Sequence, residues 1–242
     1  MLALLLMYAN TIVSIDEFIE ELWENRPPRS AVQTVQTYVM QLRKMLGAGP
    51  RGARLAERLV TTHSGYSFRV APDELDVTHF DRLVSAAHAA VARQEHAVAA
   101  SRFAEALTLW RGPALANVRI GPISRIRLVG LLESKLTAVE QRIEADLRLG
   151  RHHRLLSELS MLIERYPMYE NLYAQFMLAL YRSGRQIQAL EVFQRLRREL
   201  SGEQGLEPSP RMQRLHQAVL TGNPLLDLPA PPDTGLSLHL VS

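Results

Sequence analysis

The sequence predicts a mainly α-helical protein in which a small helical domain that ends in a β-hairpin precedes an all-helical domain. Three observations support this prediction. Apolar residues recur at helical spacing along most of the chain, residues 59–70 alternate in the manner of a hairpin, and glycine and proline separate the helical segments. The length of 242 residues fits one or two domains, and a hydrophobic fraction of 47% is enough to form a core.

Three helices are expected at the start of the chain. Residues 2–8 form a short apolar helix, and the pattern from Ser14 to Glu17 is a capping box that begins a second helix. Arg26-Pro27-Pro28 stops that helix, because the residue before a proline disfavours the helical conformation. A second capping-box pattern, from Ser30 to Gln33, begins a third helix that ends near Leu46.

A linker and a hairpin are expected next. The segment from Gly47 to Gly52 is rich in glycine and contains a proline, which predicts a linker. It also matches G-x-G-x-x-G, but a helix precedes it where a dinucleotide site needs a strand, so no such site is indicated. From Leu59 to Val70 aromatic and apolar residues alternate with polar ones, and Ser64-Gly65 marks the turn of a hairpin.

The rest of the chain, from residue 76 to about residue 220, is helical by periodicity. The expected helices are 77–92, 95–110, 124–149, 152–165, 169–182, 186–200 and 209–220. Leu149-Gly150-Arg151 recurs 34 residues later as Ser183-Gly184-Arg185. This is the period of the helix pairs in tetratricopeptide repeats, so a repeat domain of that kind is predicted.

The charge distribution sets residues 26–70 apart. This segment carries eight basic residues and one acid, which gives +7, whereas residues 1–25 carry five acids and no base. The overall charge of +3 hides this contrast. Concentrated positive charge on a small recognition element is typical of a nucleic-acid-binding domain.

The third helix combines an apolar stripe with an acid-free polar face. Placed at helical spacing, the stripe that should face the core comprises Val32, Val35, Val39, Leu42 and Leu46. The candidate DNA-binding residues of this helix are Gln33, Thr34, Thr37, Met40, Gln41, Arg43 and Lys44. Amide, hydroxyl and ammonium groups are those that bond base edges and phosphates in a major groove. A plain amphipathic helix is the alternative, but its solvated face would normally include Glu or Asp.

The hairpin is predicted to be the wing of a winged helix. Its tip, Thr62 to Ser64 with His63 between them, is small and polar, and Arg69 lies on its polar face. Such a hairpin contacts a phosphate strand or enters a minor groove, although an ordinary capping hairpin would look alike. We assign base contacts to three residues of the helix and phosphate contacts to four cations. The two sets are Gln33, Thr37 and Gln41, and Arg43, Lys44, Arg54 and Arg69.

No enzyme chemistry, metal site or cofactor is predicted. The chain has no cysteine, and its eight histidines form no metal-ligand spacing such as H-E-x-x-H. P-loop and G-x-S-x-G motifs are absent from the sequence. The apolar start, residues 1–9, lacks the marks of a signal peptide, and no apolar run reaches the roughly 18 residues that span a bilayer. A cytoplasmic protein with no membrane partner is therefore expected.

The order of two helices, a basic-faced helix, a wing and tetratricopeptide-like helix pairs resembles the Streptomyces antibiotic regulatory protein (SARP) family. Members of that family join an OmpR-type winged-helix domain to a bacterial transcriptional activator domain. The matching strings run in order through about residues 1–220. They include Glu21-Leu-Trp23, Val35-Gln-Thr-Tyr-Val39, Ala106-Leu-Thr-Leu-Trp-Arg-Gly-Pro113 and Leu206-Glu-Pro-Ser-Pro210.

The resemblance implies a nucleoid-associated transcriptional activator of antibiotic or other secondary-metabolite genes. Members bind direct repeats of double-stranded DNA near promoters and contact RNA polymerase and its sigma factor, and self-association on DNA is a family expectation. By this analogy residues 35–44 lie on the recognition helix. Glu24, Asn25, Arg26 and Arg29 would form a polymerase-facing loop.

The resemblance also divides the chain. Residues 1–72 are assigned to the DNA-binding domain, residues 73–221 to the activator domain, and residues 222–242 to a flexible tail. The family's DNA-binding domain opens with a β-sheet, and this chain opens at the helix after it, so that sheet is expected to be missing. The sequence lacks the nucleotide-binding and forkhead-associated modules of larger relatives, so no ATPase activity is expected. The alternative function is a protein-interaction scaffold that uses the helical repeats without DNA binding.

Overall fold

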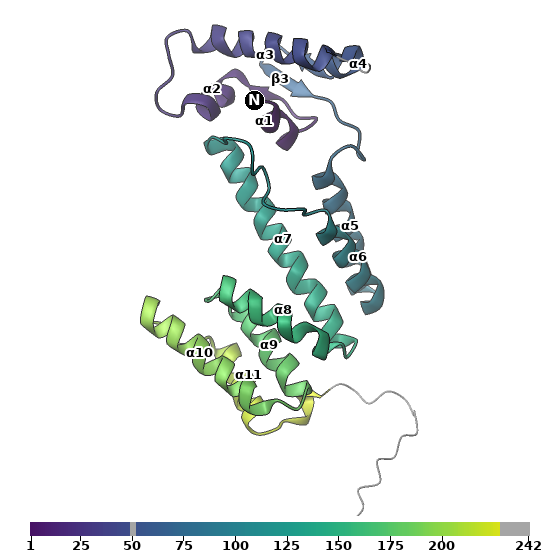
Figure 1. Cartoon of the computed structure of the whole chain (residues 1–242), viewed down its shortest axis with the longest axis vertical. Helices are drawn as coiled ribbons and strands as arrows, with labels where there is room; N and C mark the ends of the chain where they lie inside the picture. Colours follow the sequence, from purple (N-terminus) through teal and green to yellow (C-terminus); the bar gives the residue numbers. More distant parts are fainter. Residues whose placement is uncertain (49–51, 228–242) are drawn as a thin grey trace, which may run out of the picture. The chain divides into compact units, whose positions relative to one another are not determined.

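The computed structural model describes residues 1–227 except residues 49–51, and it leaves the side chains of residues 203 and 204 undescribed. The chain is mainly helical, as predicted (Figure 1). The helices are α1 (Leu2–Met7), α2 (Ile15–Trp23), α3 (Ala31–Gly47), α4 (Gly52–Glu57), α5 (Asp76–Ala92), α6 (His96–Thr108), α7 (Pro122–Arg148), α8 (His152–Arg165), α9 (Glu170–Arg182), α10 (Gln186–Gln204), α11 (Pro210–Leu220) and the short 3-10 helix η1 (Pro224–Leu226). Within the described part, none is both long and apolar enough to cross a membrane.

The chain packs as two compact units. The first unit comprises residues 1–86 and 102–139, and the second comprises residues 87–101 and 140–242. Helices α5, α6 and α7 each contribute residues to both units. Helix η1 lies within the predicted tail, residues 222–242, of which residues 228–242 lie outside the described part.

The first unit contains a three-stranded antiparallel sheet. Its strands are β1 (Val13–Ser14), β2 (Leu59–Thr61) and β3 (Gly65–Phe68), in the order β1-β3-β2. Tyr66 pairs with both Val13 and Thr61, so β3 is the central strand. The hairpin expected from the alternating pattern is therefore confirmed. Strand β1 was not predicted, because two residues are too few to show an alternation.

One hydrophobic cluster holds the helices of the first unit against this sheet. Its fully or nearly fully buried members are Leu4, Leu5, Val13, Phe18, Val35, Val39, Leu59, Tyr66 and Phe68. The ring of Phe18 meets the ring of Tyr66 edge-on, with centroids 6.0 Å apart. Burying one such side chain stabilises the fold by about 1.5–3 kcal/mol, so the cluster fixes α1, α2, α3 and the hairpin together.

The two predicted capping boxes have different outcomes. Ser14 and Glu17 form the reciprocal pair, with the Ser14 N–H donating to Glu17 Oε2 at 2.7 Å. The prediction for Ser30 is wrong, because its side chain caps no backbone group and lies 3.5 Å from Thr34 Oγ1 instead. The backbone of Ser30, with φ −92° and ψ 18°, is not in the extended conformation that an N-cap residue adopts.

Two further predictions in this region are corrected. Val32 was expected in the core stripe but is 42% exposed, because the cluster covers α3 only from Val35 onward. The linker expected from Gly47 to Gly52 is shorter than predicted, since α3 includes Gly47 and α4 begins at Gly52. Residues 49–51 of that linker lie outside the described part.

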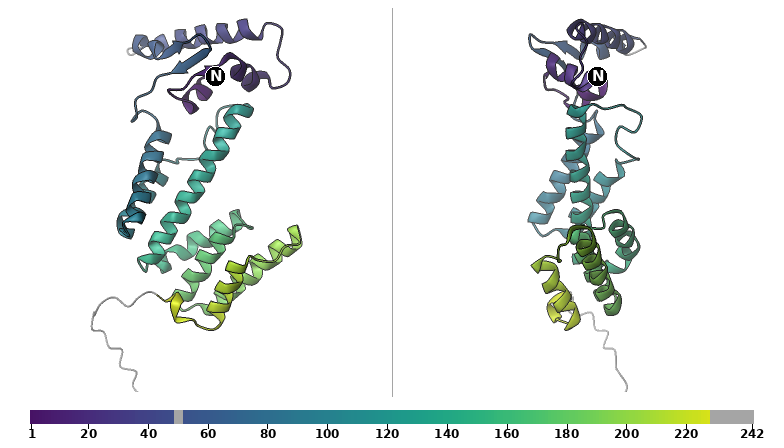
Figure 2. Two further views of the ribbon diagram at one scale, coloured as in Figure 1. Left: turned by 180° about the vertical axis from the view of Figure 1, so that it is seen from behind. Right: turned by 90° about the vertical axis from the view of Figure 1, so that its left-hand side faces the viewer.

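The second unit shows the predicted internal repeat in its geometry. Gly150 and Gly184 both adopt φ 73°, a left-handed conformation that favours glycine. The residue after each glycine closes the preceding helix in the same way: Arg151 N–H donates to Asp146 O at 3.0 Å, and Arg185 N–H donates to Leu180 O at 2.9 Å. The helices that follow stack in turn, α8 on α9 and α9 on α10, with α11 against α9 and α10 (Figure 2).

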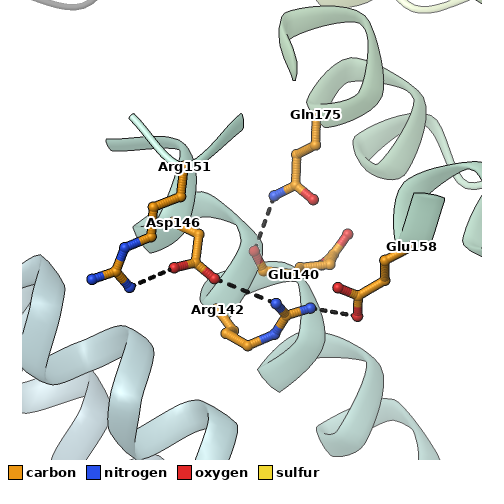
Figure 3. Close-up of polar contacts among 6 residues, drawn as sticks. All are labelled: Glu140, Arg142, Asp146, Arg151, Glu158 and Gln175. Carbon is orange, nitrogen blue, oxygen red and sulfur yellow. Dashed lines mark hydrogen bonds and ion pairs between the residues drawn. The ribbon is translucent and has the colours of Figure 1, made fainter. Parts of the chain in front are cut away.

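Polar contacts join α7, α8 and α9 (Figure 3). The Arg142 side chain is 13% exposed and lies between two carboxylates, with Nη2 2.5 Å from Glu158 and Nη1 3.4 Å from Asp146. Asp146 also accepts a bond from Arg151 at 3.0 Å, and Gln175 Nε2 donates to the Glu140 backbone oxygen at 3.0 Å. These contacts tie the end of α7 to α8 and α9.

Two histidine side chains of this unit should make its stability depend on pH. Burial lowers the pKa of His152 and His216 below the usual value of about 6.5, and the nearby His153 and Arg182 lower that of His152 further. The unfolded chain therefore takes up these protons at a higher pH than the folded chain does. The contribution of these two side chains to the free energy of unfolding should be fully present above about pH 6.5 and should fall as the pH drops below it.

The measurement is the melting temperature at about pH 7.5 and about pH 5.5 for the wild type and for His216→Gln. His216 stacks on Phe193 with centroids 4.0 Å apart, so the variant should be less stable at both values. Its melting temperature should nevertheless fall less between them than that of the wild type. An equal or larger fall would contradict this explanation.

Candidate nucleic-acid interface

The exposed side of α3 carries the polar residues that the sequence singled out. Gln33, Thr37, Gln41 and Lys44 are exposed, and Met40 is 68% exposed among them. The opposite side of α3 packs into the core through residues 35 and 39, which fixes the rotation of the helix. The surface therefore combines amide, hydroxyl and ammonium groups with the flexible apolar side chain of Met40, and it carries no carboxylate.

Two threonine hydroxyls on this helix are already engaged as donors. Thr37 Oγ1 donates to Gln33 O at 2.9 Å, and Thr34 Oγ1 donates to Ser30 O at 2.9 Å. A hydroxyl that gives its proton to a backbone carbonyl keeps lone pairs with which it can accept. Thr37 is thus arranged to accept from an amino group, such as those that adenine and cytosine display in the major groove.

The tip of the wing is a closed turn. Thr62 donates twice to Gly65 O, from its N–H at 2.9 Å and from Oγ1 at 3.1 Å. This leaves His63 and Ser64 exposed at the tip. Gly65 is required at the base, since a Cβ there would lie 2.0 Å from Val13 O.

Arg43 joins the wing to the helix. It is partly buried, and its Nη2 donates to Leu59 O at 2.9 Å and to Thr61 Oγ1 at 2.6 Å. Part of its guanidinium therefore has partners inside the domain. The phosphate contact assigned to Arg43 stays a prediction, and its observed bonds fix the position of β2 beside α3.

The other predicted phosphate-binding cations are open to solvent. Lys44, Arg54 and Arg69 are exposed on α3, on α4 and after β3. Arg58, by contrast, is paired with Glu74 at 2.5 Å. That hydrogen bond, with a second from the Ala71 N–H, lowers the pKa of Glu74. The positive field of this region therefore comes from fewer cations than the sequence count suggests.

The four residues of the predicted polymerase-facing loop are also exposed. Glu24, Asn25, Arg26 and Arg29 lie in the connection between α2 and α3. Glu24 has φ 53°, which is uncommon for a residue with a side chain, so the chain leaves α2 in a sharp turn. In the described part of the chain, no group of three or more His, Asp or Glu residues could hold a metal ion.

Sequence reasoning missed the residues that hold the base of the wing. Asn10 Nδ2 donates to Val70 O at 3.0 Å, and Asn10 Oδ1 accepts from the Val70 N–H at 2.9 Å. The Asn10 N–H also donates to Phe68 O at 3.0 Å. A pairing between residues 60 positions apart leaves no local pattern, although an asparagine just after a helix is a common carrier of the left-handed φ of 64° found here.

Comparison with known proteins places both halves of this architecture. Residues 1–70 match the family model described as "Transcriptional regulatory protein, C terminal", and residues 75–220 match "Bacterial transcriptional activator domain". Regulatory protein DnrI of Streptomyces peucetius is 46% identical over 95% of this chain and 85% of its own length. The chain belongs to the Streptomyces antibiotic regulatory protein family.

Other relatives of this SARP chain are longer. Regulatory protein AfsR of Streptomyces coelicolor is 38% identical over 93% of the chain, which spans only 22% of AfsR. A solved structure of Mycobacterium tuberculosis EmbR, in complex with a low-affinity phosphopeptide, superposes with a TM-score of 0.84 at 30% identity. It covers 95% of this chain and 59% of the EmbR chain. The winged helix followed by helical repeats is therefore the fold of this SARP.

The role of Arg43 in this SARP can be tested through stability. Arg43→Ala removes both bonds to the wing, so the free energy of unfolding should fall by roughly 1–2 kcal/mol. Arg43→Lys should recover part of the loss, because an ammonium can also donate to these acceptors, but the shorter side chain does not bring it to the position that Nη2 occupies. Chemical denaturation measures both values. Arg54→Ala, which removes an exposed guanidinium, is the control and should stay within about 0.5 kcal/mol of the wild type. An Arg43→Ala protein as stable as that control would contradict the role.

Proposed function

We propose that this protein is a sequence-specific DNA-binding transcriptional activator of antibiotic or other secondary-metabolite genes. The single observation that carries the proposal is the exposed face of α3, which displays Gln33, Thr37 and Lys44 without a carboxylate. Membership of the SARP family and the match to a transcriptional regulatory domain over residues 1–70 support it. It acts on the bacterial nucleoid, in the cytoplasm, and not as an enzyme.

The two elements of the interface have different tasks in this proposal. Helix α3 lies in the major groove, where Gln33, Thr37 and Gln41 contact base edges. Lys44, Arg54 and Arg69 neutralise phosphates, and the wing tip at residues 62–64 contacts the adjacent backbone or minor groove. Arg43 keeps the wing at a fixed position beside the helix, so that both elements engage one duplex together.

The partners follow from the family. The chain binds direct repeats near a promoter, self-associates on them, and contacts RNA polymerase and its sigma factor through the loop from Glu24 to Arg29. The opposite charges of that loop, with one carboxylate and two guanidinium groups exposed, suit a protein partner better than a phosphate backbone. Electrophoretic mobility shift on promoter DNA separates this proposal from the scaffold alternative, which predicts no shift.

Lys44 supplies the first quantitative test. Lys44→Ala should weaken binding to every DNA sequence and reduce the slope of log affinity against log salt by about one charge. Fluorescence anisotropy at several salt concentrations measures the slope. Arg102→Ala, which removes an exposed cation of α6 that pairs with Glu105, is the control and should keep the wild-type slope. A wild-type slope in the Lys44 variant would rule out its phosphate contact.

Gln33 supplies a test of base recognition. Gln33→Ala should relax the preference at one position of the binding site by about 1–3 kcal/mol, because a bidentate amide contact is lost. Selection from a randomised DNA library, sequenced for the wild type and the variant, measures the preference. The overall affinity for non-specific DNA should not change. A selection profile identical to that of the wild type would show that Gln33 contacts no base.

A further inference from the structure

A buried carboxylate from the DNA-binding half of the chain closes the first turn of the long helix in the activator half. Glu21, in the last turn of α2, is 9% exposed. Its Oε1 accepts the Gly121 N–H at 2.9 Å, and its Oε2 accepts the Ser124 N–H at 3.0 Å. All three residues belong to the first compact unit, although about a hundred positions separate them in the sequence.

Helix α7 has no cap of its own. Gly121 occupies the N-cap position and has no side chain, and Pro122, the first helical residue, has no N–H. Gly121 and Ser124 are both buried, so water cannot bond to their N–H groups. Without a partner from another part of the chain, these two N–H groups would be unsatisfied. The Glu21 carboxylate satisfies both and puts a negative charge at the positive end of the helix dipole.

The two backbones also touch at this point. A Cβ added to Gly121 would lie 2.0 Å from Glu21 O, which no side chain can tolerate without a shift. The first turn of α7 is thus held against the last turn of α2 by a forked hydrogen bond and by close packing. The chain leaves α2 three residues later, in the exposed loop that begins at Glu24.

We propose that Glu21 is a positioning residue that couples the activator domain to the DNA-binding domain. This inference rests on the proposed function: α7 fixes the end of α2, and with it the loop from Glu24 to Arg29, so that a DNA-bound protein presents that loop correctly to RNA polymerase. Glu21 is not a member of the core cluster that holds the recognition helix, so that helix should keep its place when the cap is lost. Loss of the cap should therefore reduce activation of transcription without weakening DNA binding.

The test variant is Glu21→Gln, which keeps the size of the side chain. An amide offers one acceptor to the two N–H groups and turns its own NH₂ toward the other, so the fork is broken. Glu20→Gln is the matched control, because Glu20 is the preceding residue, carries the same charge and is exposed. Amide hydrogen exchange at Gly121 and Ser124 should accelerate about tenfold in Glu21→Gln and stay at the wild-type rate in the control.

The functional readouts use full-length protein. The DNA is a promoter fragment whose repeat was selected by the wild type from a random library, and the polymerase is a Streptomyces holoenzyme. Glu21→Gln should bind a single repeat within about twofold of the wild-type Kd. Its run-off transcript yield at saturating protein should fall by about fivefold or more. The control should match the wild type in both measurements.

Each other outcome overturns the proposal in a recognisable way. Full activation by Glu21→Gln, or a loss of activation that only parallels a loss of DNA affinity, would leave Glu21 a purely structural role. Unchanged amide exchange would show that the carboxylate is not the cap. If the wild type itself fails to bind the selected DNA, the proposed function fails and the coupling fails with it. If the wild type binds and activates but the variant does so equally, only the coupling fails.

Discussion

The burial of two valines on one side of α3 determines which face of that helix the first unit exposes to solvent. Val35 and Val39 are 0% and 1% exposed in a cluster with Phe18 and Tyr66. They lie one helical turn apart, so once both are buried the rotation of α3 is fixed and its opposite side must face solvent. The candidate DNA surface is therefore a consequence of core packing, which leaves Gln33, Gln41 and Lys44 exposed to solvent.

The same core also places the wing. Tyr66 and Phe68 of β3 belong to the cluster, and Tyr66 pairs with Val13 of β1, so the central strand is anchored from two sides. Polar contacts then set the finer geometry, because Arg43 ties β2 to α3 and Asn10 holds the strand end at Val70. A helix and a hairpin that share one core keep a constant spacing, which is what simultaneous contact with a groove and its flanking phosphates requires.

Local patterns in the sequence were sufficient for the helices, the hairpin and the exposed face of α3. Periodicity depends only on neighbours within two turns, and the repeated Gly-Arg turns at Gly150 and Gly184 report a backbone conformation that the chain needs locally. Helix α4 and strand β1 were missed for the converse reason. Each is six residues or fewer, which is too short to show a periodicity. Strand β1 is held by pairing with the distant strand β3, whereas α4 packs against its chain neighbours α3 and β2. The hydrogen bonds from Arg43 to the wing were missed as well, because a cation on an amphipathic helix is ordinarily solvated.

Glu21 shows most clearly why such residues escape prediction. An uncapped helix start is not a rare signal in this chain, since the N-cap side chains of α8 and α10, Arg151 and Arg185, also make no capping bond. Those two residues are exposed, so water can satisfy the first N–H groups of their helices, whereas Gly121 is buried and water cannot reach it. Burial thus decides which helix start needs a tertiary partner, and burial is a property of the assembled fold. The acid that meets this need comes from α2, about a hundred positions away in the sequence, so the first turn of α7 is satisfied by a residue of the winged-helix region.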